Sequence, residues 1–409
     1  MQTILQISFL FGHEVSMSFL AETWLFWSLF ILGLVLFRQA RRSLVGQFLF
    51  ERFLLALFTL LLVSIVIFAV MEAVPGDCAT RMIAYKNTQG TVITDADIQA
   101  ERKLRGLDGA VYERWGKWVY GLVTEGDLGF SCEKRAPVQQ VLGNRFLISL
   151  AVCGLGLLFA YSLALPLGVI SAIIMTQPLV DHDPQHSAGE KFGRSLGLVT
   201  SKIFEALLRI VSYLGLALPN FLIALGIIVF YIQLDLDAPI GLFSEEFRDQ
   251  AWWLEDSFNT AKLGDFLWHF WLPVFTLGWS ATALQLQTVR ALTIDEANKL
   301  YVTAARARGQ AGASLWMRYP VRHSIGPLVN SVGFDFNRIF NDLPIVASII
   351  LLTDAGQLLL TALAFTNDQE LASSILFLIT LTIVVVNFLS DVLLALFDPR
   401  IQRSVLKGG

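Results

Sequence analysis

Long apolar stretches alternate with short polar ones along this 409-residue chain. A helix needs about 20 consecutive, mostly apolar residues to cross the hydrocarbon core of a bilayer. Hydropathy therefore predicts membrane spans at residues 18–37, 52–75, 146–177, 203–233, 267–292, 325–352 and 371–396. The pattern indicates an all-α polytopic membrane protein.

Composition supports this interpretation. Hydrophobic residues make up 55% of the chain and charged residues only 16%, with a mean hydropathy of +0.60. A soluble domain would carry about 25% charged residues. The composition thus excludes a globular enzyme with one large soluble core.

The positions of Lys and Arg predict which loops face the cytoplasm, because these residues gather in short cytoplasmic loops. Basic residues are frequent in four segments that the predicted topology places on one side: 38–52, 178–202, 293–327 and the tail after 396. The acidic loop 234–266 falls on the opposite side. We therefore expect a periplasmic N-terminus and a cytoplasmic C-terminus.

The polar segment 293–327, called here the basic insert, separates two predicted spans. Thr293 and Glu296 have the spacing of a capping box, which predicts that a new helix begins just after the fifth span. Gly309 fits the left-handed position that ends such a helix. The segment thus predicts an amphipathic helix of about 15 residues, some 22 Å long.

The faces of that helix allow two interpretations. Lys299, Thr303 and Arg306 share one face. Another face carries Ile294, Ala297, Tyr301 and Ala304. Such a helix suits a position on anionic lipid, and it equally suits a groove in another protein. The residues by themselves leave both open.

Charged residues also occur inside the sixth predicted span, at Asp335, Arg338 and Asp342. Their i, i+3 and i, i+4 spacing allows them to pair with one another. Charges at bilayer depth usually face a cavity or a partner helix. They are therefore interpreted either as part of a translocation path or as an ion-pair ladder at a subunit interface.

The three cysteines and five histidines do not have metal-ligand spacing. Cys153 lies in an apolar run and is expected to be a packing residue. Cys78 and Cys132 both fall outside the membrane, either as a disulfide or as two free thiols. No metal site is predicted.

Two further groups are given structural interpretations. Glu205 and Arg209 are expected to be anchors at the membrane surface, with long side chains that reach the headgroups. Trp252 and Trp253 fit an aromatic belt or, in the acidic loop, a contact with a binding protein.

The basic insert resembles the EAA loop of ABC importer permeases, here Glu296–Asn298 leading to Ala305–Gly309. Further stretches resemble the dipeptide, oligopeptide and nickel permease class in order and spacing. These are Val74–Asp77, Leu104–Asp108, Trp115, Trp118, Gly126–Ser131, Pro137–Val138, Arg145, Asn387, Asp391 and Asp398–Ile401.

This resemblance implies a type I ABC importer transmembrane fold, with six core helices within residues 52–396 plus one extra N-terminal helix. It divides the chain into 1–45, an extra helix and linker; 46–145, the first core helix and a long periplasmic segment; and 146–409, the permease core. The chain would lie in the bacterial inner membrane. The basic insert would hold the residues that couple to an ATPase: Glu296, Ala297, Ala305, Arg306, Ala307, Arg308, Gly309, Arg318 and Arg322.

The implied partners are a second homologous permease, one or two cytoplasmic ABC ATPase subunits, a periplasmic solute-binding protein and membrane lipid, without nucleic acid. The chain has no G-x-x-x-x-G-K-[ST] phosphate loop, so ATP and Mg²⁺ are expected in the partner ATPases and no cofactor in this chain. The expected solutes are peptides or peptide-like compounds; nickel chelates, opines and sugar conjugates are alternatives.

The chain departs from the class pattern at three places. Asp354-Ala355 stands where Pro-Gly is typical, His323 stands where Asn is usual, and Pro320 interrupts an expected helix. Two other classes fit less well. An ion-coupled secondary transporter would show an internal repeat, and an intramembrane hydrolase would need a nucleophile–base pair or a metal cluster.

Overall fold

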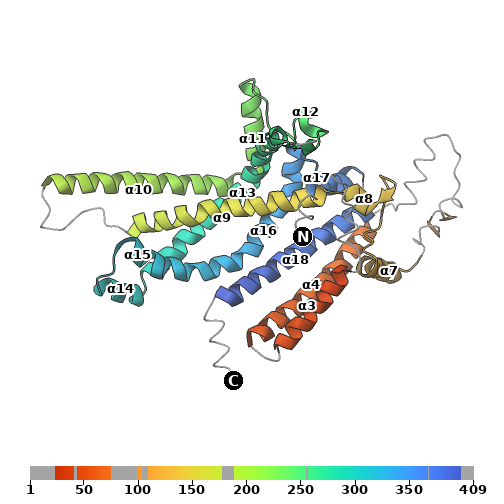
Figure 1. The fold of residues 1–409 in the computed structure, drawn as a ribbon, viewed down its shortest axis with the longest axis horizontal. Coiled ribbons are helices and arrows are strands. Elements are labelled where there is room, and N and C mark those ends of the chain that lie inside the picture. Colours follow the sequence, from red (N-terminus) through yellow and green to blue (C-terminus); the bar gives the residue numbers. More distant parts are fainter. Residues whose placement is uncertain are drawn as a thin grey trace. The chain divides into compact units, whose positions relative to one another are not determined.

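Helices form almost all of the regular structure, as the hydropathy pattern predicts. The computed structural model describes residues 24–40, 44–74, 99–100, 102–103, 109–176, 188–254, 257–366 and 368–397. Cys78, the first residues of the predicted span 18–37 and the motifs at 75–77, 104–108 and 398–401 lie outside these ranges. The chain divides into two compact units, and Figure 1 labels their helices.

The first unit contains residues 1–150, 240–269 and 343–409. Its longest helices are α3 (Trp24–Ala40), α4 (Leu44–Ala73) and α18 (Gln369–Phe397). Both α3 and α18 pack against α4. An ion pair of 3.7 Å joins Arg52 of α4 to Asp391 of α18.

A short extramembrane segment is fastened to the beginning of α18. It comprises α7 (Val111–Thr124), the antiparallel strands β1 (Phe130–Ser131) and β2 (Ala136–Pro137), and α8 (Val138–Leu142). The buried Asp368 carboxylate accepts hydrogen bonds from Ser131 Oγ at 2.5 Å and from the backbone N–H of Glu133 at 3.2 Å. Because a buried carboxylate needs such donors, these bonds fix the hairpin on the helix.

The acidic loop is folded around its own lysine. It contains α12 (Glu245–Arg248) and the paired strands β3 (Trp253–Leu254) and β4 (Ser257–Phe258). The Lys262 ammonium lies 4.8 Å from the ring centre of Phe243 and 5.2 Å from that of Trp252. Trp252 also stacks on Phe258. The Trp252 ring therefore packs within the loop.

The second unit contains residues 151–239 and 270–342. It is built from α9 (Arg145–Thr176), α10 (Ala188–Ala217), α11 (Asn220–Gln233), α13 (Thr260–Ala297) and α16 (Arg322–Ile349), with short helices of the basic insert between the last two. Glycines bring α9 and α13 together, because a Cβ at Gly278 would lie only 2.7 Å from the carbonyl oxygen of Gly156.

The predicted span 203–233 is not one straight helix. The chain bends by 104° between α10 and α11, around Leu218 and Pro219 (Figure 1). Proline has no N–H to continue the helical ladder, and it disfavours helical geometry in the residue before it. The next helix begins at Asn220, where the Pro219 carbonyl accepts the N–H of Leu222.

Within the described residues, three helices are long and apolar enough to cross a membrane: Val45–Ala73, Arg145–Thr176 and Gln369–Ala395. The bent pair formed by α10 and α11 would make a fourth. The predicted spans 267–292 and 325–352 lie inside α13 and α16. These two helices carry more polar side chains, many of them facing other helices.

Asp354-Ala355, which stands where Pro-Gly is typical of the class, has a local structural role. Asp354 is buried and caps α17 (Ala355–Leu360), which continues as a π-helical turn, η3 (Thr361–Phe365). Its carboxylate accepts the N–H of Gln357 at 2.8 Å and the hydroxyl of Ser149 at 2.9 Å. The aspartate thus begins a helix here.

Burial raises the pKa of Asp354 from 3.8 to about 6. This group lies between α16 and α17, outside the membrane-spanning helices. Since its pKa is higher in the folded state, its stabilising contribution is complete below the ordinary value and is lost as the pH rises through about 6. Asp354→Asn cannot titrate, and its amide oxygen still accepts the Gln357 N–H.

We therefore expect wild-type protein to gain about 1 kcal/mol of stability relative to Asp354→Asn when the pH falls from about 7 to about 5. Thermal unfolding of both detergent-purified proteins, followed by tryptophan fluorescence, measures this difference. A stability difference that does not change with pH would contradict the prediction.

Candidate functional site

The first helix of the basic insert begins later than the sequence predicts. Thr293 and Glu296 do not cap a new helix, because α13 continues through both of them to Ala297. The chain turns at residues 298–299, and α14 (Leu300–Ala307) follows. The expected 15-residue helix is thus 8 residues long.

Gly309 ends α14, as predicted. Its φ is +82°, the left-handed conformation that glycine adopts without strain. Its N–H donates to the Arg306 carbonyl at 2.9 Å, and the next N–H, of Gln310, donates to the Ala305 carbonyl. These bonds satisfy carbonyls at the end of α14.

Pro320 does not end the helix in which it lies. α15 (Gly312–Trp316) continues through a π-helical turn, η2 (Met317–Val321), into α16. The wider turn accommodates a residue that lacks an N–H and whose ring would clash with the carbonyl four residues earlier. The second half of the basic insert is therefore one helix with a local widening.

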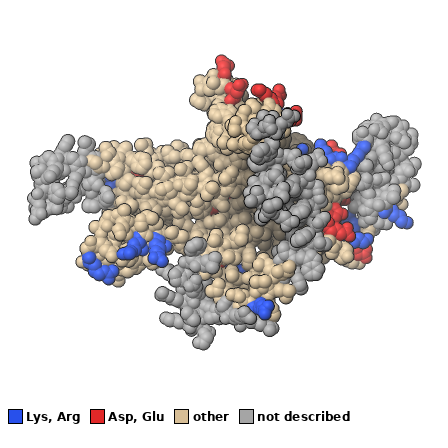
Figure 2. Space-filling model, viewed as in Figure 1, with Lys and Arg blue, Asp and Glu red and all other residues tan. Residues whose placement is uncertain are grey.

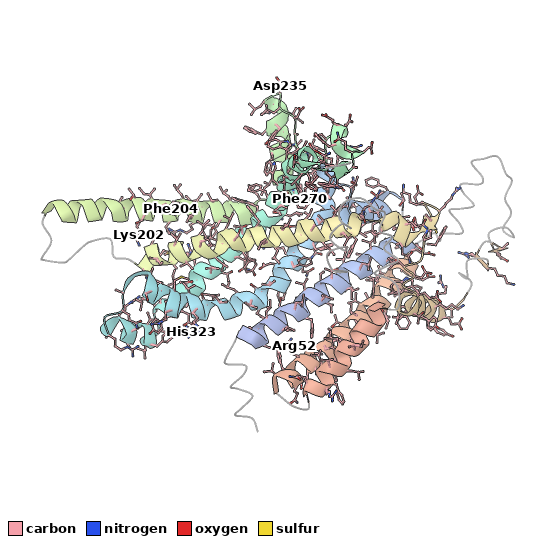
Figure 3. All side chains as sticks on the ribbon, viewed as in Figure 1. Arg52, Lys202, Phe204, Asp235, Phe270 and His323 are labelled. Atoms are coloured by element: carbon pink, nitrogen blue, oxygen red, sulfur yellow. The ribbon has the colours of Figure 1, made fainter. Side chains whose placement is uncertain are left out.

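His323 supports this widened turn. Its Nδ1 lies 2.8 Å from the carbonyl oxygen of Tyr319, and the ring stands at the beginning of α16, close to α14 (Figure 3). The carbonyl can only accept, so Nδ1 carries the proton. The ring N–H thus satisfies a carbonyl of the widened turn.

A small hydrophobic core holds α14 in place. Val302 and Ala305 of α14 pack with Leu315 of α15, and the rings of Tyr301 and Tyr319 lie against them. Of the predicted coupling residues, Ala297 and Ala305 are buried, so they serve packing and are not a contact surface. Glu296 is half-buried.

The remaining predicted coupling residues are exposed: Arg306, Ala307, Arg308, Gly309, Arg318 and Arg322. Lys299, Thr303 and Ala304 are also exposed. Figure 2 shows basic side chains gathered over α14 and α15. Within the described residues, none of these four arginines forms an ion pair.

Two exposed apolar residues of this surface were not predicted from the sequence. Leu300 is 86% exposed and Met317 is 61% exposed. Large apolar side chains on a polar, extramembrane surface often mark contacts with another protein. The corrected start of α14 would have revealed Leu300, because it then falls opposite the buried positions.

Asp335 forms a polar junction inside the second unit. Its Oδ2 accepts hydrogen bonds from the Tyr161 hydroxyl of α9 at 2.7 Å and from Gln285 Nε2 of α13 at 2.6 Å. Ser331 Oγ lies 3.1 Å from the Tyr161 hydroxyl and 3.2 Å from Gln285 Nε2. The carboxylate thus joins α9, α13 and α16, and its side chain is buried.

Asp342 has a separate set of partners. Its Oδ2 accepts from Asn220 Nδ2 at 2.8 Å, and the same amide lies 3.0 Å from Ser280 Oγ. In the described part of the chain, Arg338 forms no ion pair with either aspartate. Each carboxylate therefore bonds to other helices of this chain, and the interpretation of the three residues as an ion-pair ladder at a subunit interface stays a prediction.

Glu205 was also misinterpreted. It is 2% exposed and accepts from Arg290 at 3.1 Å, from Arg209 at 3.0 Å and from Ser171 Oγ at 3.3 Å. It is a buried junction between α9, α10 and α13 and not an anchor at the membrane surface. The i, i+4 spacing of Glu205 and Arg209 was the available signal.

The cysteines and the candidate metal ligands were also the subject of sequence predictions. Cys132 is buried and disulfide-bonded, and Cys153 is a buried free thiol. Cys78 lies outside the described residues, so its pairing with Cys132 stays a prediction. Among the described residues, no three His, Cys, Asp or Glu side chains are grouped as metal ligands would be.

The Asp335 junction generates a stability prediction. Asp335→Ala removes the acceptor that the Tyr161 hydroxyl and the Gln285 amide share and leaves them only the longer contacts with Ser331 Oγ, so we expect it to lower the free energy of unfolding by about 2 kcal/mol. Asp335→Asn keeps one acceptor oxygen and should lose less. Unfolding of the detergent-purified variants measures both effects. Equal stability of Asp335→Ala and wild type would refute the junction's role.

Two family models match the chain. The model described as "Binding-protein-dependent transport system inner membrane component" matches residues 192–403, which is more than half of the chain. The model of the N-terminal part of such membrane components matches residues 45–154. The helix α3 precedes both matched segments.

Curated relatives agree with these matches. The oligopeptide transport system permease protein AppB of Bacillus subtilis is 26% identical over 359 residues, which are 88% of this chain and 100% of the relative. The glutathione transport system permease protein GsiC of Escherichia coli O6:H1 is 25% identical over 345 residues, 84% of this chain and 95% of the relative.

These matches and the apolar helices confirm the predicted fold class, the type I ABC importer transmembrane fold. They also confirm a multi-pass protein of the inner membrane, of the kind that works with an ATPase and a binding protein. The chain belongs to the family of inner membrane components of binding-protein-dependent transport systems, as a permease of an ABC importer.

Proposed function

We propose that this chain is the permease subunit that, with a second permease, forms the pathway for uptake of peptides or peptide-like solutes delivered by a periplasmic binding protein. Its relatives include permeases named for oligopeptides and for glutathione, a peptide-like compound. The proposal places ATP and Mg²⁺ in one or two cytoplasmic ATPase subunits and none in this chain, which has no phosphate loop.

The observation that carries the proposal is the exposed surface of the basic insert. Leu300 and Met317 are exposed in it, together with Arg306, Arg308, Arg318 and Arg322. Exposed apolar side chains together with arginines are typical of protein interfaces. This surface suits an ATPase better than a lipid headgroup layer, because its exposed apolar residues are interspersed with charged and polar ones and form no continuous apolar face that lipid would bury.

Coupling follows from how this surface is mounted. α14 follows the end of α13, and α15 continues through η2 into α16. A push on α14 therefore reaches two long helices, which are joined further along by Gln285 and Asp335. In this proposal, closure of the ATPases moves these helices and so opens the pathway to one side of the membrane or the other. The N-terminus would be periplasmic and the C-terminus cytoplasmic.

The arginines of α14 test the ATPase contact. Because Arg306 and Arg308 are exposed, Arg306→Glu with Arg308→Glu should leave the fold intact but weaken ATPase binding by about tenfold or more. Co-purification and binding titration with the ATPase measure the loss. Lys134→Glu, an exposed charge reversal in the extramembrane segment, is the control. Unchanged affinity in the double variant would sink the coupling proposal.

Asp342 tests the pathway. It is partly exposed, and Asp342→Asn keeps an oxygen that accepts the Asn220 amide, so the fold should be retained. If this charge faces the pathway, the variant should change the uptake rate by about tenfold while the complex stays assembled. Uptake and size-exclusion chromatography distinguish the cases. Loss of the second permease would instead place Asp342 at the subunit interface.

A further inference from the structure

Tyr301 connects three elements of the basic insert. It lies in the first turn of α14, and its hydroxyl donates a hydrogen bond to Glu296 Oε2 at the end of α13. Its ring lies 6.2 Å from the ring of Tyr319 in η2 and 5.2 Å from that of His323 in α16 (Figure 3). One side chain thus contacts the segments on both sides of α14.

The other contacts of α14 do not fix its orientation. A helix of 8 residues is too short to be stable by itself and depends on packing. Its buried residues, Val302 and Ala305, contribute small, non-directional contacts with Leu315. Such a core keeps α14 in place but allows it to tilt. Hydrogen bonds are directional. The bond from the Tyr301 hydroxyl to the Glu296 carboxylate spans the turn at residues 298–299.

We propose that Tyr301 is the positioning residue that makes α13, α14 and α16 move as one body, so that ATPase motion is converted into movement of both long helices. This inference rests on the proposed coupling function. We call the contacts of Tyr301 with Glu296, Tyr319 and His323 the clamp. Without the clamp, an ATPase bound to α14 tilts this helix, while α13 and α16 do not move with it. ATP is then hydrolysed without a matching movement of solute.

Three variants separate the contributions. Tyr301→Phe removes only the hydroxyl and its bond to Glu296. Tyr301→Leu also removes the ring contacts but keeps an apolar side chain against the small core. Glu296→Gln keeps an acceptor oxygen for the hydroxyl. Tyr213→Phe, at an exposed position of α10, is the matched control for loss of a tyrosine hydroxyl.

The complete importer is reconstituted in liposomes with radiolabelled trialanine and radiolabelled glutathione as probes. We expect Tyr301→Leu to lower the amount of probe taken up per ATP hydrolysed about tenfold, and Tyr301→Phe about threefold. The ATPase rate and co-purification should stay near wild type in both. Glu296→Gln replaces the charged acceptor by a weaker neutral one and should give a ratio between those of Tyr301→Phe and wild type. Tyr213→Phe should keep the wild-type ratio.

A second measurement needs no solute. Spin labels at the exposed positions Thr303 of α14 and Asn330 of α16 report the distance between these helices in the complete complex. We expect a narrow distance distribution in the wild-type background, with or without vanadate-trapped nucleotide. In Tyr301→Leu it should broaden when nucleotide is trapped.

The outcomes distinguish the clamp from the proposed function. An unchanged ratio and distance distribution in both Tyr301 variants would refute the clamp while leaving ATPase coupling intact. A parallel fall of uptake, ATPase rate and assembly would show that Tyr301 is merely structural. Failure of the wild-type chain to bind an ATPase would refute the coupling proposal itself.

Discussion

The pairing of buried polar groups is the constraint on which the second unit depends. In a medium without water, a carboxylate or amide that loses its partner is costly, so each must find one within the protein. Asp335, Asp342 and Glu205 each bond to groups on other helices. These bonds are directional, and they select which helices lie together and in which register. The apolar surfaces between the helices lack this selectivity, because lipid tails are as apolar as leucine.

The same constraint explains why α13 and α16 are more polar than the other long helices. Both contribute to the junctions, and both lead into the basic insert. A helix that carries polar groups cannot turn about its axis or slide without breaking their bonds. α13 and α16 are therefore suited to transmit a displacement along their length. The kinked pair α10 and α11 is tied to them where Asn220 contacts Ser280 and Asp342.

In the first unit, buried polar groups attach an extramembrane segment to the end of a helix. Asp368 at the beginning of α18 does this with side-chain and backbone donors of the β1–β2 hairpin. The stretch Gly126–Ser131, one of those that resemble the peptide permease class, lies in this attachment. Its Ser131 hydroxyl donates to Asp368, so at least this part of the motif is structural. In the acidic loop, Lys262 and the surrounding rings play the corresponding role.

The sequence by itself determined the all-α membrane character, most of the helix positions and the glycine stop at Gly309, because hydropathy and backbone freedom are local properties. It also located the basic insert and its exposed arginines. Only the tertiary structure decided the rest. The true start of α14, the π-helical turn at Pro320 and the burial of Ala305 depend on the core with Leu315. The partners of Asp335, Asp342 and Glu205 were missed for the same reason: spacing along one helix reveals its own neighbours, whereas these groups bond to residues far away in the sequence.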